Sequence, residues 1–432
     1  MIFFKVSQNI NIKIADNSLV VLNKENKNKE EEEYIYISTF FDFEAIKEIF
    51  KSVGDSYKTM VVNEKWILEK KSFPIELGVS NKNEFLLQKQ KQKAYSFLDS
   101  LESFNKDELY KNSDFVDIKT QLKVNKKDIS IAIIGGVGRD IGEMINGLNA
   151  LRILYKVLQK KYKNIKIDLF LESAQNQYYK RDKEFLEKDS TINQVLPLCI
   201  KLNKFMEYDY YIDNSLIYET TFYKELNYID AYLYKFGIDS TKTDQHLKYN
   251  YYDMSFYQVP QELKNELDKI KKQSKIVLFH PFTPKADRSI PKDIANSFLK
   301  ELISISDYSI VSALKIDKIE NDKFFDLSRY SKSLFDFIYI ISQADYIITA
   351  DTSTYHISDL FLIPTVSVFS DEELAQKRLK YYQSTKAYIL EEKKKNLSLL
   401  RFDNELLTIN KYSKYKSLKA KKVLKLLNTI YQ

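Results

Sequence analysis

The sequence predicts an α/β protein in which two doubly wound parallel-sheet domains follow a small α+β domain. Apolar, strand-like runs alternate with amphipathic helical stretches twice along the chain, at about 128–265 and 272–390. Such alternation is typical of βαβ units, which build parallel sheets. A third observation is glycine, because the chain has only 8 in 432 residues and five of them lie between 135 and 147. Glycine this rare is kept where the backbone needs its conformational freedom, so we expect the cluster to mark a site.

Residues 1–125 read as an accessory α+β domain. Alternating and apolar runs predict short antiparallel strands, and later stretches have helical periodicity. The strands are expected at 10–14, 19–22 and 34–38, and the helices at 42–52 and 83–104. No catalytic motif stands out in this region. The alternative to a purely accessory role is a site that binds an acceptor or a partner.

The first doubly wound domain is predicted to open with a buried parallel strand at 129–136, an apolar run that ends in glycine. A long helix is expected from about 143 to 162, because apolar residues recur there close to every 3.6 positions. The next strand is expected at 165–172, and the pattern continues to 229–239.

The second doubly wound domain repeats this alternation. Strands are expected at 274–281, 308–314, 344–350 and 364–370, and helices at 291–306, 333–343 and within 351–362. Ligands of such sheets bind beyond the carboxyl ends of the strands, at the point where the strand order reverses. A helical tail at 391–432 completes the predicted chain.

Composition favours a cytoplasmic protein without a membrane span. No apolar run approaches the roughly 20 residues that a span requires, and the start lacks the features of a signal peptide. The single cysteine, Cys199, allows no internal disulfide, which suits a reducing compartment. The net charge is +7, and lysines are densest at 411–425. That stretch is interpreted as a solvated helix face or as a surface attracted to an anionic membrane; nothing beside it indicates nucleic acid.

The most informative motif is Asp351–His356, where a buried strand runs directly into a helix. Asp351 or Thr352 is expected to cap the helix, and the remaining N–H groups with the hydroxyls of Thr352 and Ser353 form an anion site. His356 lies one turn further on. The alternative is a plain helix cap beside a surface histidine. The scarcity of histidine favours the anion site, because His280 and His356, two of only three, both follow strands of one sheet.

Two other kinds of site are not supported. The chain contains no Asp-x-Asp sequence, and one cysteine with three scattered histidines argues against a zinc site, so no metal is expected. The run Gly135-Gly136-x-Gly138 lacks the full GxGxxG spacing and a clear acidic partner about 20 residues on, which argues against NAD.

Four segments together resemble glycosyltransferase family nine, the ADP-heptose heptosyltransferase family. They are ADYIITADTSTYHISDLFLIPTVSVF (344–369), GEMINGLNALRIL (142–154), HPFTPKADRSIP (280–291) and IDAYLYKFGID (229–239). The resemblance covers about 129–390. It implies a GT-B fold, with two Rossmann-like domains facing a cleft. Residues 128–265 would then be the acceptor domain and 272–390 the donor-nucleotide domain.

The resemblance also implies site residues. Glu143 aligns with the family's general-base aspartate, with Asp140 as the rival base and Gly138 and Gly142 in the acceptor-side loop. The alternative without a catalytic role is that Glu143 is a first-turn acid that interacts favourably with the helix dipole.

Arg288 falls where the family has a phosphate-contacting lysine, and a surface arginine is the alternative. His280 and Thr283 lie on the same side as Arg288. Phe282 and Ser353 stand where the family has glycine.

The function implied is inverting transfer of a heptose-like sugar from a nucleotide-diphosphate donor, possibly ADP-heptose, to a surface-glycan or lipopolysaccharide-type acceptor. The acceptor would be a glycan or glycolipid at the inner face of the membrane, and no cofactor besides the donor is expected. Three alternatives stay open: a protein acceptor, a nucleotide-sugar epimerase or hydrolase, and a catalytically degenerate protein kept for binding or scaffolding.

Overall fold

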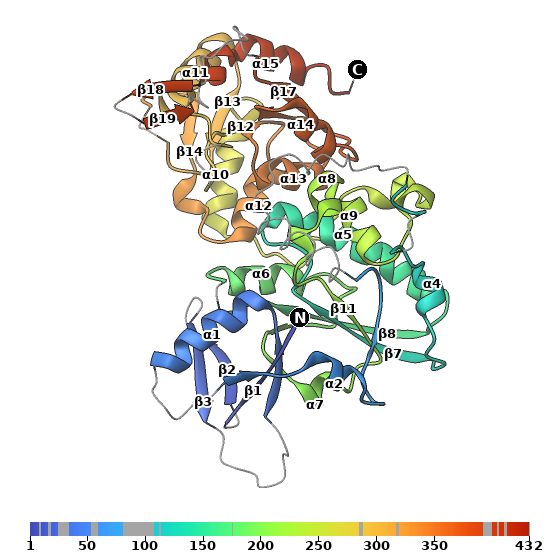
Figure 1. Cartoon of the computed structure of the whole chain (residues 1–432). Coiled ribbons are helices and arrows are strands. Elements are labelled where there is room, and N and C mark those ends of the chain that lie inside the picture. The colour runs from blue at the N-terminus through green and yellow to red at the C-terminus, as the bar shows by residue number, and fades with distance from the viewer. Residues whose placement is uncertain are drawn as a thin grey trace. The chain divides into compact units, whose positions relative to one another are not determined.

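The computed structural model places most of the chain in two compact units (Figure 1). One unit comprises Met1–Arg139 and Asn146–Lys248, and the other comprises Asp140–Ile145 and Tyr249–Gln432. The residues that the structure describes are 1–7, 10–15, 19–24, 34–52, 59–80, 108–111, 114–174, 176–284, 288–316, 319–391, 400–403, 406–409 and 413–431. The predicted helix at 83–104 lies outside them.

The beginning of the first unit is an antiparallel sheet with strand order β10-β4-β1-β5, covered by helix α1. Its elements are β1 (Ile2–Val6), β4 (Ile35–Ser38), α1 (Phe40–Ser52), β5 (Thr59–Val61), α2 (Glu64–Leu68) and β10 (Ile200–Lys201). Strands β2 (Ile10–Ala15) and β3 (Leu19–Lys24) form a separate antiparallel pair. Phe43, Ile46 and Phe50 of α1 pack on this antiparallel sheet. The predicted strands and the helix at 42–52 are confirmed.

The second sheet of this unit is fully parallel, with strand order β6-β11-β7-β8-β9. Its strands are β6 (Ile75–Glu76), β7 (Asp128–Ile134), β8 (Asn164–Leu171), β9 (Gln194–Pro197) and β11 (Tyr210–Asp213). Helices are α4 (Ile118–Gln121), α5 (Ile141–Gln159), α6 (Tyr179–Leu186), α7 (Leu202–Phe205), α8 (Thr221–Glu225) and α9 (Tyr228–Lys235). The predicted strands at 129–136 and 165–172 and the long helix after the glycines are confirmed.

The antiparallel sheet and the first parallel sheet share one core. Phe3 and Ile37 from the antiparallel sheet belong to the same buried cluster as Ile134 and Phe170 from the parallel one. Backbone pairing joins them as well, since β10 leaves the parallel-sheet region of the chain and pairs with β4. Strands β1 and β4 therefore pack as part of the first unit. The domain limits expected from the sequence stay predictions.

The second unit is built on a six-stranded, fully parallel sheet with strand order β14-β13-β12-β15-β16-β17. The strands are β12 (Ile276–His280), β13 (Ser309–Ser312), β14 (Phe324–Asp326), β15 (Tyr346–Ala350), β16 (Thr365–Phe369) and β17 (Thr385–Ile389). The helices are α10 (Gln261–Lys271), α11 (Lys292–Ile305), α12 (Leu334–Ser342), α13 (Ser353–Leu360) and α14 (Glu372–Arg378). Numbered along the chain, the strands run 3-2-1-4-5-6, so the order reverses between β12 and β15. The predicted α/β class with two parallel sheets is confirmed.

The basic stretch near the C-terminus is a core-packed helix. Helix α15 (Ala420–Leu427) buries Ala420, Val423 and Leu427 in the cluster that contains the second sheet. The lysines at 416, 419, 421, 422 and 425 are exposed, as expected for a solvated helix face. The predicted tail also contains a strand pair, β18 (Leu400–Asp403) with β19 (Leu406–Ile409). Among the described residues, no helix has the length and apolarity needed to cross a membrane.

Candidate functional site

The turn between β15 and α13 lies at the switch point of the second sheet, and hydroxyl groups hold it in place. The Thr352 side chain caps α13 by accepting a hydrogen bond from the Thr354 backbone N–H at 3.0 Å. Thr349 Oγ1 lies 3.1 Å from Thr352 Oγ1 and donates to the His280 carbonyl of β12, also at 3.1 Å. Of the two caps that the sequence allowed, Thr352 is the one used. The first N–H groups of α13 therefore begin where the strand order reverses.

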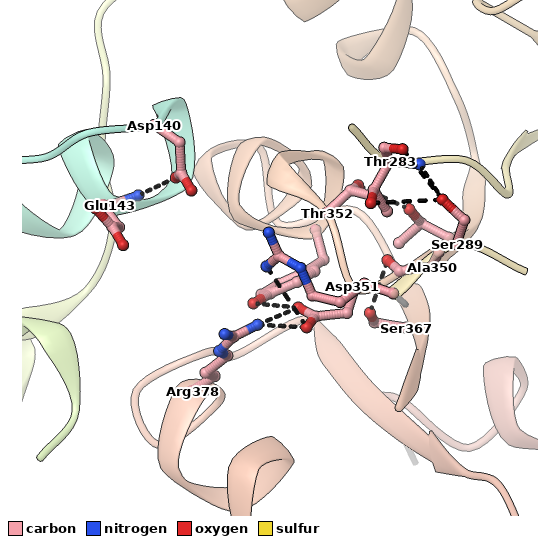
Figure 2. Close-up of polar contacts among 12 residues, drawn as sticks. Asp140, Glu143, Thr283, Ser289, Ala350, Asp351, Thr352, Ser367 and Arg378 are labelled. Carbon is pink, nitrogen blue, oxygen red and sulfur yellow. Dashed lines mark hydrogen bonds and ion pairs between the residues drawn. The ribbon is translucent and has the colours of Figure 1, made fainter. Parts of the chain in front are cut away.

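Asp351 has a different role, because its carboxylate is surrounded by cationic and phenolic groups. Arg378 Nη1 hydrogen-bonds both carboxylate oxygens, as Figure 2 shows. Arg288 Nη1 lies 3.7 Å from Oδ2, and the Tyr355 hydroxyl donates to Oδ1 at 3.3 Å. Asp351 is only 5% exposed. Two guanidinium charges face one carboxylate, which leaves one net positive charge beside the N-terminus of α13.

Arg378 is the residue that the sequence did not reveal. It lies in the last turn of α14, 27 positions after Asp351. A basic residue at that position is already explained by the helix dipole, and Lys377 beside it looks the same in sequence. Arg288 was expected at this site, and the structure places its guanidinium on the same carboxylate. Its Nε is buried and has no hydrogen-bond partner among the described residues.

His356 is buried beneath this cationic group. Its ring stacks on Tyr355 with centroids 4.1 Å apart, and its Nδ1 is hydrogen-bonded to the Tyr382 hydroxyl. Burial, followed by the positive charges of Arg378 and Arg288, holds the pKa of His356 well below its usual range. The ring is therefore neutral at physiological pH. Its expected contact with a bound anion stays a prediction.

His280 connects β12 to α13. Its Nδ1 lies 2.9 Å from Thr354 Oγ1, and its ring meets Phe337 edge-on at 5.4 Å. Burial lowers the pKa of His280 to about 4, although a hydrogen bond with the Phe282 backbone opposes the shift. His280 thus positions the capping turn, and a direct phosphate contact from it stays a prediction.

Thr283 lies in the loop after β12, part of which (285–287) is outside the described residues. The Thr283 N–H donates to Ser289 Oγ at 2.9 Å, and Ser289 Oγ donates back to the Thr283 carbonyl at 3.1 Å (Figure 2). Phe282, which stands where glycosyltransferase family nine has glycine, packs on the core of the second unit. The larger side chain therefore anchors the loop that carries Arg288.

The two candidate bases at the start of α5 have distinct local roles. Asp140 Oδ1 accepts the Glu143 backbone N–H at 2.9 Å, and the Asp140 carbonyl accepts the Met144 N–H at 2.8 Å (Figure 2). Asp140 is thus the N-cap of α5, and Glu143 is a half-buried first-turn residue. The cap uses Asp140 Oδ1, and the general-base role expected of Glu143 or Asp140 stays a prediction.

The glycine cluster is explained first by close backbone packing. Gly135 has φ +88°, and a Cβ there would lie 3.0 Å from the backbone of Ser215. A Cβ on Gly147 would lie 1.9 Å from the Val137 carbonyl oxygen. Gly138 also has positive φ, at 152°, and Gly142 is the second residue of α5. Their expected place in an acceptor-side loop stays a prediction.

Within the part of the chain that the structure describes, no three His, Cys, Asp or Glu side chains gather as a metal site would require. The expectation of metal-independent chemistry stays a prediction.

Comparison with known proteins gives distant structural likenesses only. No family model matches the chain, and no curated protein matches it significantly. The ADP-heptose lipopolysaccharide heptosyltransferase II of E. coli is 13% identical, with a TM-score of 0.43 over 70% of this chain and 98% of that one. A family 9 glycosyl transferase from Veillonella parvula is 10% identical, with a TM-score of 0.46 over 71% and 98%.

A third solved structure is the iron-containing dodecameric glycosyltransferase TibC of enterotoxigenic E. coli. It is 11% identical, with a TM-score of 0.41 over 72% of this chain and 77% of that one. Because these identities are so low, the fold is argued from the strand order of this chain, and the site is argued from the contacts of its own residues.

Proposed function

We propose that this chain is an inverting, GT-B-type glycosyltransferase that uses a nucleotide-diphosphate sugar. The observation that carries the proposal is the cationic turn of the second unit, where Arg288 and Arg378 converge on Asp351 at the sheet's switch point. The capped N-terminus of α13 begins two residues further on. The four segments that resemble glycosyltransferase family nine support the same function.

The leaving group of such a transfer is a nucleoside diphosphate, whose charge grows as the glycosidic bond breaks. Arginine holds a diphosphate through paired N–H donors, and a helix N-terminus adds backbone N–H groups. In the proposed complex Arg288, Arg378 and Ser353 contact the donor phosphates. Asp351 aims the guanidinium groups from behind, because a carboxylate cannot itself accept a hydrogen bond from an ionised phosphate. Positive charge at the departing oxygen lowers the barrier to bond cleavage.

The proposed base is Glu143. The acceptor hydroxyl attacks the anomeric carbon, its proton passes to the Glu143 carboxylate, and the bonding electrons leave with the diphosphate. One displacement inverts the configuration at that carbon. Asp140 orients the helix turn that carries Glu143 through the N-cap bond. General-base assistance of this kind contributes about 10²- to 10⁴-fold in rate.

The identities of the donor and the acceptor are proposed from the resemblance to glycosyltransferase family nine. We propose a heptose-like donor such as ADP-heptose, and a surface-glycan or lipopolysaccharide-type acceptor at the cytoplasmic face of the membrane. A protein acceptor is the other candidate of the same chemistry. The exposed lysines of α15 suit an anionic surface, while the apolar side of that helix is held in the core.

The deciding experiment measures donor binding and turnover of the full chain. ADP-heptose, other ADP-sugars and UDP-sugars are screened by thermal shift, and nucleotide release is followed with and without a glycan acceptor. Stabilisation by one sugar nucleotide and acceptor-dependent release with inversion support the proposal. Release that needs no acceptor supports a hydrolase or epimerase, and binding without turnover supports a degenerate binding protein.

Arg288→Ala tests the phosphate contact. Its loss is expected to weaken donor binding by about tenfold, as for one charge-assisted contact. Lys300→Ala is the matched control, because it removes a cation from the exposed side of α11 in the same unit. Equal donor affinity in the two variants would remove Arg288 from the site.

A further inference from the structure

The first unit contains a cavity of about 290 Å³ at the carboxyl ends of β7 and β8. Its lining includes Phe41 from α1, Arg139 from the glycine-rich loop, and Leu171 with Glu172 at the end of β8. Asn176 and Asp182 complete the polar side. In open α/β sheets this edge is where ligands bind. The volume is near the lower end of small-molecule pockets, roughly 300 to 1,000 Å³, so one small ring fits better than an extended chain.

The N-terminal segment contributes Phe41 to the lining of this cavity and contacts the loop after β8. The buried Asp42 carboxylate of α1 accepts the backbone N–H groups of Ser173 and Ala174, both at 2.9 Å. Those residues directly follow Glu172, whose carboxylate is hydrogen-bonded to the Thr39 hydroxyl. The start of α1 thus holds the loop after β8 in position. Residues before 125 lie outside the segments that resemble glycosyltransferase family nine.

The lining combines an apolar face with both hydrogen-bond donors and acceptors. Phe41 and Leu171 supply the apolar face, and the Arg139 guanidinium lies 5.6 Å from the Phe41 ring and 3.8 Å from the Tyr218 ring. Glu172 is half-buried, and burial raises its pKa against the opposing influences of Arg139 and Thr39. The Asn176 amide donates to Asp182 at 3.1 Å.

This chemistry distinguishes between ligand classes. A phosphate is disfavoured, because the described lining holds two carboxylates and a single arginine. A purely apolar ligand would leave the polar groups without solvent, which costs free energy. A sugar ring matches both sides, since its C–H face packs on an aromatic ring and its hydroxyls both donate and accept hydrogen bonds.

We propose that this cavity binds a neutral sugar ring, and that α1 is therefore part of the acceptor-binding site. The assignment of that sugar to the acceptor rests on the proposed function, whereas sugar binding itself does not. Phe41 provides the stacking surface, and Arg139 and Glu172 hold the hydroxyls.

The test uses the full chain and a panel of methyl glycosides (glucoside, galactoside, mannoside and a heptoside), with inorganic phosphate as the anionic probe. Binding is measured by saturation-transfer NMR and titration calorimetry. Phe41→Ala is expected to weaken binding of the best glycoside at least tenfold. Phe40→Ala is the matched control, because Phe40 is the neighbouring residue of α1, is 45% exposed and does not line the cavity; it is expected to change affinity less than twofold.

Arg139→Gln keeps the test decisive if Phe41→Ala fails to fold, since the Arg139 side chain is at the surface. It is expected to weaken glycoside binding about fivefold and to leave sugar-nucleotide binding unchanged. The proposal is overturned if no glycoside binds the wild type, if phosphate binds in their place, or if both variants bind like the wild type.

Failure of this proposal and failure of the proposed function give different results. If Phe41→Ala and Arg139→Gln lose glycoside binding while the wild type turns over no sugar nucleotide, the sugar site stands without the transferase. If the wild type transfers sugar and both variants keep its acceptor KM, the transferase stands and the cavity is not its acceptor site.

Discussion

The two parallel sheets each have a turn at the carboxyl end of a central strand, and the two turns are built from different residue types. The turn after β7 is rich in glycine, and Gly136 has its carbonyl held by the Asn214 side chain at 2.7 Å. The turn after β15 has no glycine and is held by the hydroxyls of Thr349 and Thr352. The first turn lets the backbone come close to neighbouring backbone, and the second fixes a helix cap and leaves recognition to side chains. A switch point can therefore be shaped by backbone geometry or by side-chain hydrogen bonds, and this chain uses both.

The largest effect is expected at the second turn, from Arg378→Ala. Removing this arginine leaves the buried Asp351 carboxylate with the Tyr355 hydroxyl and the longer contact to Arg288. We expect the free energy of unfolding to fall by about 3 kcal/mol, as when one partner of a buried pair is removed, and donor affinity to fall with it. Urea unfolding and donor titration measure the two effects. Lys377→Ala is the adjacent control, and equal results from both variants would show that Asp351 needs no partner on α14.

Acid should weaken the second unit more than the first, because only the second buries histidines. The pKa of His280 is lowered to about 4, so the unfolded chain binds its proton more readily than the folded one. The stabilisation is complete above the ordinary histidine pKa of about 6.5 and is lost as pH falls toward 4. Between pH 7.5 and 5 the loss is about 2 kcal/mol, and His356 acts in the same direction.

Hydrogen exchange measures this acid effect separately in each unit, with His246→Gln as the control because His246 is exposed. His280→Gln is expected to reduce the acid dependence of α13 protection. Equal acid sensitivity of the two units would contradict the explanation.

At the first turn, Gly147→Ala tests how tightly the backbone packs. The added Cβ would lie 1.9 Å from the Val137 carbonyl oxygen, so α5 must shift to accept it. We expect a loss of about 2 kcal/mol in the free energy of unfolding, measured by urea denaturation. Asn149→Ala lies on the same helix and adds no atom near that carbonyl. A Gly147→Ala variant as stable as the wild type would mean that the glycine is not a packing requirement.

The smallest effect is expected from the cap itself. Thr352→Ala removes the oxygen that accepts the Thr354 N–H, and we expect a loss of about 1 kcal/mol. Thr352→Ser keeps the hydroxyl and should recover most of it. Thermal unfolding distinguishes the two variants, and identical values for both would assign the stability to the methyl group and not to the cap.

The sequence predicted the sheets well because buried parallel strands read as continuous apolar runs. The strands that became β7, β12, β15 and β16 lie within two residues of their expected limits. It also brought out the turn at Asp351 and the cation at Arg288. The sequence did not reveal Arg378 or Tyr382, because their contacts arise where α14 and the chain after it fold back on α13. Hydrophobic periodicity predicts helices and strands but not which of them come into contact. Nor could it show that Asp42 holds the loop after β8, since 131 positions separate the partners.

The pairing of β10 with β4 also affects the order in which the chain can assemble during synthesis. Ile37 and Ile200 are register partners that stand 163 positions apart in the sequence (200 minus 37). Until residue 200 leaves the ribosome, β4 remains an uncovered strand edge, which is prone to pair wrongly with other chains. At roughly 5 to 20 residues per second this interval lasts about 10 to 30 s. Strand β4 is thus made long before its sheet is completed, and protection of its edge by chaperones during translation is expected to govern the yield of folded protein.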